Sequence, residues 1–209
     1  MIKLALQSSQ FFRLCGALLG LLAAHAAGAA DVRVKVVDPQ GMPLEHAAVA
    51  LKPQAGGAPA RSREVDIVQH EKRFLPLMTA VRTGTAVRFP NLDTVRHHVY
   101  SFSPAKSFEL KLYIGTPAAP IVFDTPGVVV MGCNIHDTMV GYVVVSDAPW
   151  VGVSDGEGSV RFEGIPAGEY ELEYWHPRWV GAVNELVRQR LQVAEGVAAT
   201  LRLVIGERP

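Results

Sequence analysis

The feature that most restricts the fold of this sequence is a two-residue alternation of apolar and polar side chains that recurs along its length. Apolar residues alternate at Val32, Val34 and Val36, at Tyr170, Leu172 and Tyr174, and at Leu201, Leu203 and Ile205. Successive side chains of a strand point to opposite faces, so this period predicts half-buried β-strands. The 19 Gly and 14 Pro residues separate the runs as turns. The sequence therefore predicts an all-β protein built from β-sandwiches.

Residues 1–30 have the organisation of a secretory signal peptide. Lys3 and Arg13 precede an apolar run at residues 14–24, and small residues at 27–29 form a cleavage pattern. The run is too short for a stable membrane span, which disfavours the alternative of an uncleaved anchor. We therefore expect a periplasmic or secreted protein without membrane contact after cleavage.

The charge balance and the cysteine content indicate which kinds of function the protein can have. The chain has 20 basic and 20 acidic residues, and the mature protein would keep 18 basic residues against 20 acidic ones. No basic tract suggests nucleic-acid binding. Cys15 lies within the signal peptide, so Cys133 would be the single cysteine of the mature chain. A metal ligand explains such a cysteine better than a spare thiol in an oxidising compartment does.

One short segment carries the main functional signal. Cys133, His136 and Met139 follow one another at intervals of three residues, between apolar runs at 128–131 and 139–145. Runs of this length are typical of strands, and a tight loop between two strands lets its side chains converge. With one more histidine, these residues would provide the two imidazoles, thiolate and weak thioether of a mononuclear blue-copper centre.

The block at residues 74–145 resembles the cupredoxins, most closely amicyanin and pseudoazurin. Their first ligand is a histidine followed by Asn-Val, where this chain reads His97-His98-Val99, and Cys-x2-His-x2-Met is the short ligand loop of amicyanin. Phe-Pro-Asn-x-Asp, His-His-Val-Tyr-Ser-Phe-Ser-Pro-Ala-Lys and Gly-Cys-Asn-Ile-His-Asp resemble bacterial cupredoxin-like methylamine utilization proteins. The resemblance implies a type 1 copper site whose ligands are His97, Cys133, His136 and Met139.

Two neighbouring histidines compete for the first ligand position. Consecutive strand residues face opposite sides, so His97 and His98 cannot both reach one metal without distorting the strand. The His-Asn-Val pattern favours His97 and leaves His98 beside the site, with its backbone supporting the cysteine sulfur. Asp93 is expected to cap the turn in which it lies and to support the site from behind the ligands. By resemblance, we also expect Ile135, Val140 and the rim at residues 103–106 to surround the exposed loop histidine.

The remaining strands predict a second, enclosing domain. Residues 32–51 and 154–172 resemble the two parts of a carboxypeptidase regulatory-like, or prealbumin-like, β-sandwich. We therefore predict that this sandwich comprises residues 31–54 and 147–207. The cupredoxin-like domain at residues 62–146 would be inserted between them, because hairpin tips tolerate insertions.

Three functions fit this reading. The first is one-electron transfer between redox protein partners, without enzymatic activity, because the ligand set leaves no open position for substrate. The second is a copper carrier or buffer, which would expose extra ligands such as His98, Met131 or Met78. The third is a structural sandwich with a vestigial or zinc-filled site, in which Met139 would have no role.

Overall fold

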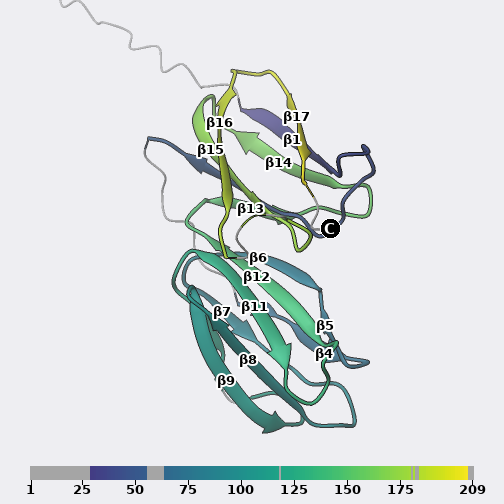
Figure 1. Ribbon diagram of the computed structural model, residues 1–209. Helices are drawn as coiled ribbons and strands as arrows, with labels where there is room; N and C mark the ends of the chain where they lie inside the picture. Colours follow the sequence, from purple (N-terminus) through teal and green to yellow (C-terminus); the bar gives the residue numbers. More distant parts are fainter. Residues whose placement is uncertain (1–28, 56–63, 118, 180, 182–183, 207–209) are drawn as a thin grey trace, which may run out of the picture.

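A computed structural model describes residues 29–55, 64–117, 119–179, 181 and 184–206. Every helix or strand assigned in these ranges is a β-strand, which confirms the predicted all-β class. The strands form two bodies, one above the other in Figure 1. Nearly all of the predicted signal peptide falls on residues 1–28, outside the described ranges. No helix with the length and hydrophobicity needed to cross a membrane occurs in the described ranges.

The upper body in Figure 1, here called the outer sandwich, has one sheet of three strands and one of four. The first sheet has the order β14 (Ser159–Ile165), β1 (Ala30–Val37), β17 (Ala199–Val204), and the second has the order β13 (Trp150–Val153), β2 (Ala48–Pro53), β15 (Gly168–Trp175), β16 (Val187–Val193). Val32, Val34 and Val36 of β1 are fully buried in its core together with Leu172 of β15. The predicted alternation therefore corresponds to the inward face of a sheet.

The lower body, here called the inner sandwich, has one sheet of five strands and one of three, with a separate β4–β5 hairpin. The large sheet has the order β6 (Met78–Arg82), β12 (Val140–Ser146), β11 (Gly127–Cys133), β8 (His97–Ser103), β9 (Lys106–Tyr113); the small sheet has the order β10 (Ile121–Phe123), β7 (Thr85–Arg88), β3 (Val65–Asp66); and the hairpin joins β4 (Val68–His70) to β5 (Arg73–Leu75). Phe74, Phe89 and Phe123 fill a core that also contains Cys133 and Met139.

The inner sandwich interrupts the outer one in chain order. Strands β3 to β12 lie between β2 and β13, and these two strands pair with each other from Trp150↔Leu51 to Val153↔Ala48. The chain therefore leaves and re-enters the outer sandwich at neighbouring strands, which is the arrangement that tolerates an insertion. The prealbumin-like character of the outer sandwich and the domain boundaries given above remain predictions.

A third buried cluster joins the two sandwiches. It consists of Ala48, Met78, Val128, Val144, Trp175 and Leu186. The rings of Tyr142 and Trp175 meet in this contact with their centroids 5.3 Å apart. The buried carboxylate of Glu173 accepts hydrogen bonds from the hydroxyl of Ser146 and from Nε of Arg188. The outer sandwich therefore covers the outward face of the large inner sheet around β6, β12 and the start of β11.

Candidate metal centre

Two strand ends and one loop bring three ligand atoms together. His97 is the first residue of β8 and Cys133 the last residue of β11, and these strands are antiparallel neighbours with Cys133 opposite Val99. Both side chains point into the inner core, with exposures of 0% for His97 and 4% for Cys133. The Sγ of Cys133 lies 3.8 Å from Nδ1 of His97 and 3.7 Å from Nδ1 of His136. The three ligand atoms all lie within 4.8 Å of one another.

The ligand loop at residues 134–139 is a tight turn whose backbone closes on itself. The Cys133 amide donates to the Met139 carbonyl over 3.2 Å, and the Met139 amide donates to the His136 carbonyl over 2.9 Å. This turn explains why a spacing of three residues brings an imidazole back to the sulfur. The side chain of Met139 is buried in the same core cluster as Cys133. The structure thus groups His97, Cys133 and His136 directly and encloses Met139 beside them.

His98 lies on the opposite face of β8, as strand alternation requires. Its Nε2 is 2.9 Å from Oε1 of Glu109 on the neighbouring strand, and its ring packs edge-on against Tyr100. The ligand atoms near Cys133 Sγ therefore come from His97 and His136. Of the two histidines that the sequence offered as the first ligand, His97 is the one that lies next to the Cys133 thiol.

Asp93 fixes the orientation of His97 from behind. Its Oδ2 lies 2.7 Å from Nε2 of His97, and a carboxylate only accepts hydrogen bonds, so Nε2 carries the proton and Nδ1 presents its lone pair toward Cys133. The amides of Glu71 and Lys72 also donate to Asp93, over 2.7 and 2.9 Å. Burial by itself raises the pKa of Asp93, but the hydrogen bonds from Lys72, His97 and Glu71 outweigh it and the pKa is lowered. The carboxylate therefore stays charged next to the imidazole.

The turn that Asp93 caps is not the one expected. The sequence suggested that Asp93 caps the turn in which it lies, whereas the amides it accepts belong to the β4–β5 turn, about twenty residues earlier in the chain. Glu71 and Lys72 have φ values of 53° and 57°, in the left-handed region that residues other than glycine rarely adopt. Their amides both point at the carboxylate, so one side chain holds the turn and the ligand histidine together.

Asn91, which lies in the Phe-Pro-Asn-x-Asp motif, and two polar residues that the sequence did not single out hold the loop before His97. Asn91 donates to the carbonyls of Val95 and Tyr113, and the Tyr113 hydroxyl donates to the Phe89 carbonyl over 2.7 Å. Gln69 donates to both Tyr113 and Phe89. Burial is the main cause that raises the pKa of Tyr113 to about 12, with the hydrogen bond from Gln69 opposing it and the electrostatic effect of the nearby Cys133 adding to it. No motif marks Gln69 or Tyr113.

The rim predicted at residues 103–106 lies at the wrong end of the sheet. These residues form the turn between β8 and β9, and the seven residues of β8 separate them from the ligand end by about 20 Å. A Cβ added at Gly127, the first residue of β11, would lie 3.0 Å from Cβ of Ala105, whereas Cys133 is the last residue of that strand. The expectation that this turn surrounds the loop histidine is therefore wrong.

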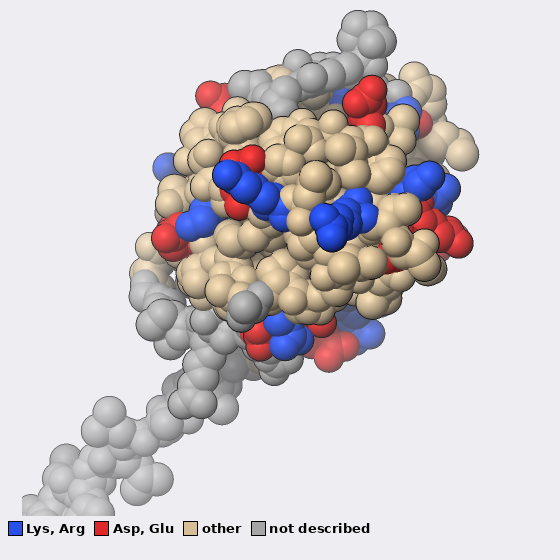
Figure 2. Space-filling model, turned by 90° about the horizontal axis from the view of Figure 1, so that it is seen from below, with Lys and Arg blue, Asp and Glu red and all other residues tan. Residues whose placement is uncertain are grey.

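Other apolar residues surround the ligand end. They are Leu92 and Val95 in the loop before β8, Ile114 after β9, and Ile135 in the ligand loop, with exposures between 42% and 65%. His136 is half-buried among the residues of this loop. Figure 2 looks onto the end at which β9 and β11 finish, and uncharged residues make up most of that face, with Lys and Arg side chains across its middle.

Solved structures of copper proteins are similar to part of this chain. No family model and no curated protein matches the chain. A purple cupredoxin from Nitrosopumilus maritimus is 26% identical over 40% of this chain and 98% of its own, with a TM-score of 0.34. The copper-containing nitrite reductase of Thermus scotoductus is 24% identical over 54% of this chain and 28% of its own, with a TM-score of 0.38. Amicyanin from Paracoccus versutus is 16% identical over 46% of this chain and 98% of its own, with a TM-score of 0.34. Because these TM-scores are low, the site is assigned from the residues of this chain alone.

Proposed function

We propose that the protein binds one copper ion through His97, Cys133, His136 and Met139 and transfers single electrons between protein partners in the periplasm or outside the cell. The observation that carries this proposal is the pair of imidazole Nδ1 atoms within 3.8 Å of one buried sulfur. A thiolate, two imidazoles and a thioether form a donor set that suits copper in both of its oxidation states. Bound copper would supply a reversible one-electron change.

The side chains of this site are suited to keeping their positions during such a change. His97 is held by Asp93, and Cys133 ends a paired strand inside the apolar core. Supports of this kind orient ligands and limit their movement. Met139 and the core residues around it keep water away from the sulfur. We propose no catalytic role, because these four side chains would leave no ligand position for a substrate.

Half-buried His136 would connect the centre to the surface. Its neighbours at the ligand end are the exposed apolar residues Leu92, Val95, Ile114 and Ile135. Small apolar surfaces suit transient redox partners, which must dissociate after each transfer. We therefore propose that an unidentified redox protein docks at this end.

Two observations disfavour the alternative functions. A copper carrier would need accessible ligands near its site, but Met131 is enclosed in the inner core and Met78 in the contact between the sandwiches, with exposures of 1% and 2%. The third candidate, His98, faces away from the ligands, with Nε2 2.9 Å from Oε1 of Glu109. A zinc site on Cys133 and two histidines would give no purpose to a buried methionine at position 139.

Potentiometric titration of the copper-loaded protein tests the proposal. We expect one copper per chain and a reversible one-electron wave that repeats over many cycles, and we expect Cys133→Ser to lose that wave. Copper that is released on reduction would identify a carrier. Stoichiometric zinc with no stable copper form would identify a structural site.

A further inference from the structure

A hollow of about 730 Å³ lies where the ligand loop, the β4–β5 hairpin and the outer sandwich meet. Thr138 comes from the ligand loop, Val140 from the start of β12, and His46 from the turn before β2. The rest of the wall comes from residues 71–77, which run from the hairpin turn toward β6. Pockets of about 300–1,000 Å³ are typical of sites for small organic molecules. The hollow is therefore large enough to hold one.

The side chains at this hollow combine positive charge with apolar surface. Lys72 and Arg73 line it, and neither side chain forms an ion pair or hydrogen bond with a described residue. These two cations share the wall with one carboxylate, Glu71, so one positive charge remains unbalanced when His46 is neutral. The apolar part of the wall consists of Phe74, Leu75, Pro76, Leu77 and Val140. This combination suits a singly charged anion with an apolar body, because a second negative charge would find no counter-charge in the wall.

The backbone around the hollow has an unusual conformation. His46, Glu71 and Lys72 have φ values of 68°, 53° and 57°, and in the described ranges they are the only residues other than glycine with a positive φ. All three line the hollow. Left-handed conformations of this kind cluster at sites that bind ligands, where surrounding contacts maintain them. The hollow therefore has a property of binding sites besides its charge.

Hydrogen bonds connect the hollow to the metal centre. The amides of Glu71 and Lys72 donate to Asp93, and Asp93 also lies 2.7 Å from Nε2 of His97. Thr138, in the wall of the hollow, directly precedes Met139 in the chain. An anion bound beside Lys72 would therefore be separated from the His97 imidazole by one hydrogen-bonded carboxylate. Added negative charge at this distance favours the more positive, oxidised state of a metal.

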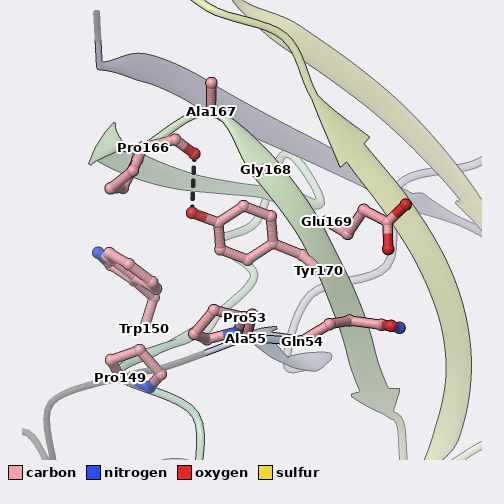
Figure 3. A pocket seen from close by; sticks show the side chains of 10 residues that line it. All are labelled: Pro53, Gln54, Ala55, Pro149, Trp150, Pro166, Ala167, Gly168, Glu169 and Tyr170. Carbon is pink, nitrogen blue, oxygen red and sulfur yellow. Dashed lines mark hydrogen bonds between the residues drawn. The ribbon is translucent and has the colours of Figure 1, made fainter. Parts of the chain in front are cut away.

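A hollow of about 630 Å³ in the outer sandwich lacks these features. Its apolar walls are formed by Pro53, Pro149, Pro166, Trp150 and Tyr170. Figure 3 shows that the Tyr170 hydroxyl donates to the Pro166 carbonyl. In the same view the polar ends of Gln54 and Glu169 point away from the rings. Neither a cationic side chain nor a residue of the ligand loop lines this hollow, so it offers an anion no counter-charge.

We infer that the hollow at residues 71–77 binds a small organic anion, a carboxylate joined to an apolar or aromatic body, and that the bound anion lowers the reduction potential of the metal centre. The carboxylate lies beside Lys72 and Arg73, and the apolar body lies against the hairpin residues that follow them. The effect on the potential rests on the proposed copper function and acts through Asp93 and His97. By reciprocity, the oxidised protein binds the anion more tightly than the reduced protein does.

Binding is tested first on the full mature chain without copper, with 3-phenylpropionate as the probe. We expect its addition to shift the backbone amide resonances of residues 71–75 and of Thr138. The neutral 3-phenylpropanamide and the small anion acetate should each bind at least threefold more weakly, because each lacks one half of the recognised group.

Variants of the same copper-free chain test the role of charge. Lys72→Gln and Arg73→Gln should each weaken the binding of 3-phenylpropionate at least threefold. Lys111→Gln is the matched control, because Lys111 lies on the edge strand β9 and does not line the hollow. Resonance shifts centred elsewhere, equal binding of 3-phenylpropanamide, or equal binding by all variants would overturn the inference.

The effect on the metal centre is tested next by voltammetry of the copper-loaded protein at low ionic strength, because salt screens exposed charges. We expect 3-phenylpropionate to bind the oxidised form about twofold more tightly than the reduced form, so that saturating probe lowers the potential by about 18 mV, at about 59 mV per tenfold change. The neutral 3-phenylpropanamide should leave the potential unchanged, and Lys72→Gln should lose the shift while keeping the visible spectrum. An unchanged potential with the probe bound would overturn the coupling. Binding at the hollow without reversible copper chemistry would instead contradict the proposed function and leave the anion site in place.

Discussion

His97 and His98 are adjacent in sequence but lie in different environments. His97 is fully buried with Nδ1 3.8 Å from the Cys133 sulfur, whereas His98 faces Glu109 on the other side of the sheet. We therefore expect His97→Ala to lose the coloured copper centre and His98→Ala to keep it. Absorption spectra of the two copper-loaded variants decide this. If His98→Ala alone lost the colour, the ligand assignment would have to move to His98.

Asp93 places a negative charge against the ligand histidine. The Asp93→Asn variant removes this charge and should favour the reduced, less positive metal. We therefore expect the reduction potential to rise by tens of millivolts, where about 59 mV corresponds to a tenfold change in the equilibrium constant of a one-electron couple. Asp124→Asn is the matched control, because Asp124 is paired with Lys106 at the far end of the sheet. Voltammetry of both variants measures the difference. Equal potentials would show that Asp93 acts on the turn at residues 71–72 and not on the metal centre.

At the level of elements, the close approach of β12 to the hairpin strand β5 depends on a glycine. A Cβ added at Gly141 would lie 2.9 Å from Cβ of Phe74 and 3.1 Å from Cε of Met131. We expect Gly141→Ala to destabilise the protein by about 1–3 kcal/mol, because overpacking forces neighbouring side chains to move. Gly156→Ala serves as the control, since no atom lies within 4 Å of its added Cβ. Denaturant unfolding of the two variants should differ by that amount, and equal stabilities would contradict the packing described.

The strands that the sequence predicted are those that obey a local rule. Alternation at Val32, Val34 and Val36 corresponds to one buried face of β1, and the run at residues 128–131 lies within β11. The spacing of Cys133 and His136 was informative for the same reason, since one tight turn produces it. Features that depend on contacts far apart in the chain were missed or misplaced. Asp93 reaches a turn some twenty residues away, and the turn at residues 103–106 lies at the end of the sheet opposite the ligands.

At the scale of the whole molecule, the two sandwiches share a buried contact centred on Trp175, which is 2% exposed. We expect them to unfold together, and we expect Trp175→Ala to cost about 3–5 kcal/mol and to lower the stability of both. Loss of copper colour and change of tryptophan fluorescence should then follow one common transition in wild-type protein. A colour that persists after the outer sandwich has unfolded would show that the sandwiches are independent.

The visible absorption spectrum of the copper-loaded protein tests the central claim most directly. A copper ion held by the Cys133 thiolate and two imidazoles should give an intense charge-transfer band in the oxidised state. We predict that ascorbate bleaches this band, that reoxidation restores it, and that Cys133→Ser lacks it. An oxidised copper protein with only weak d–d absorption would contradict the assignment of a blue-copper electron-transfer centre.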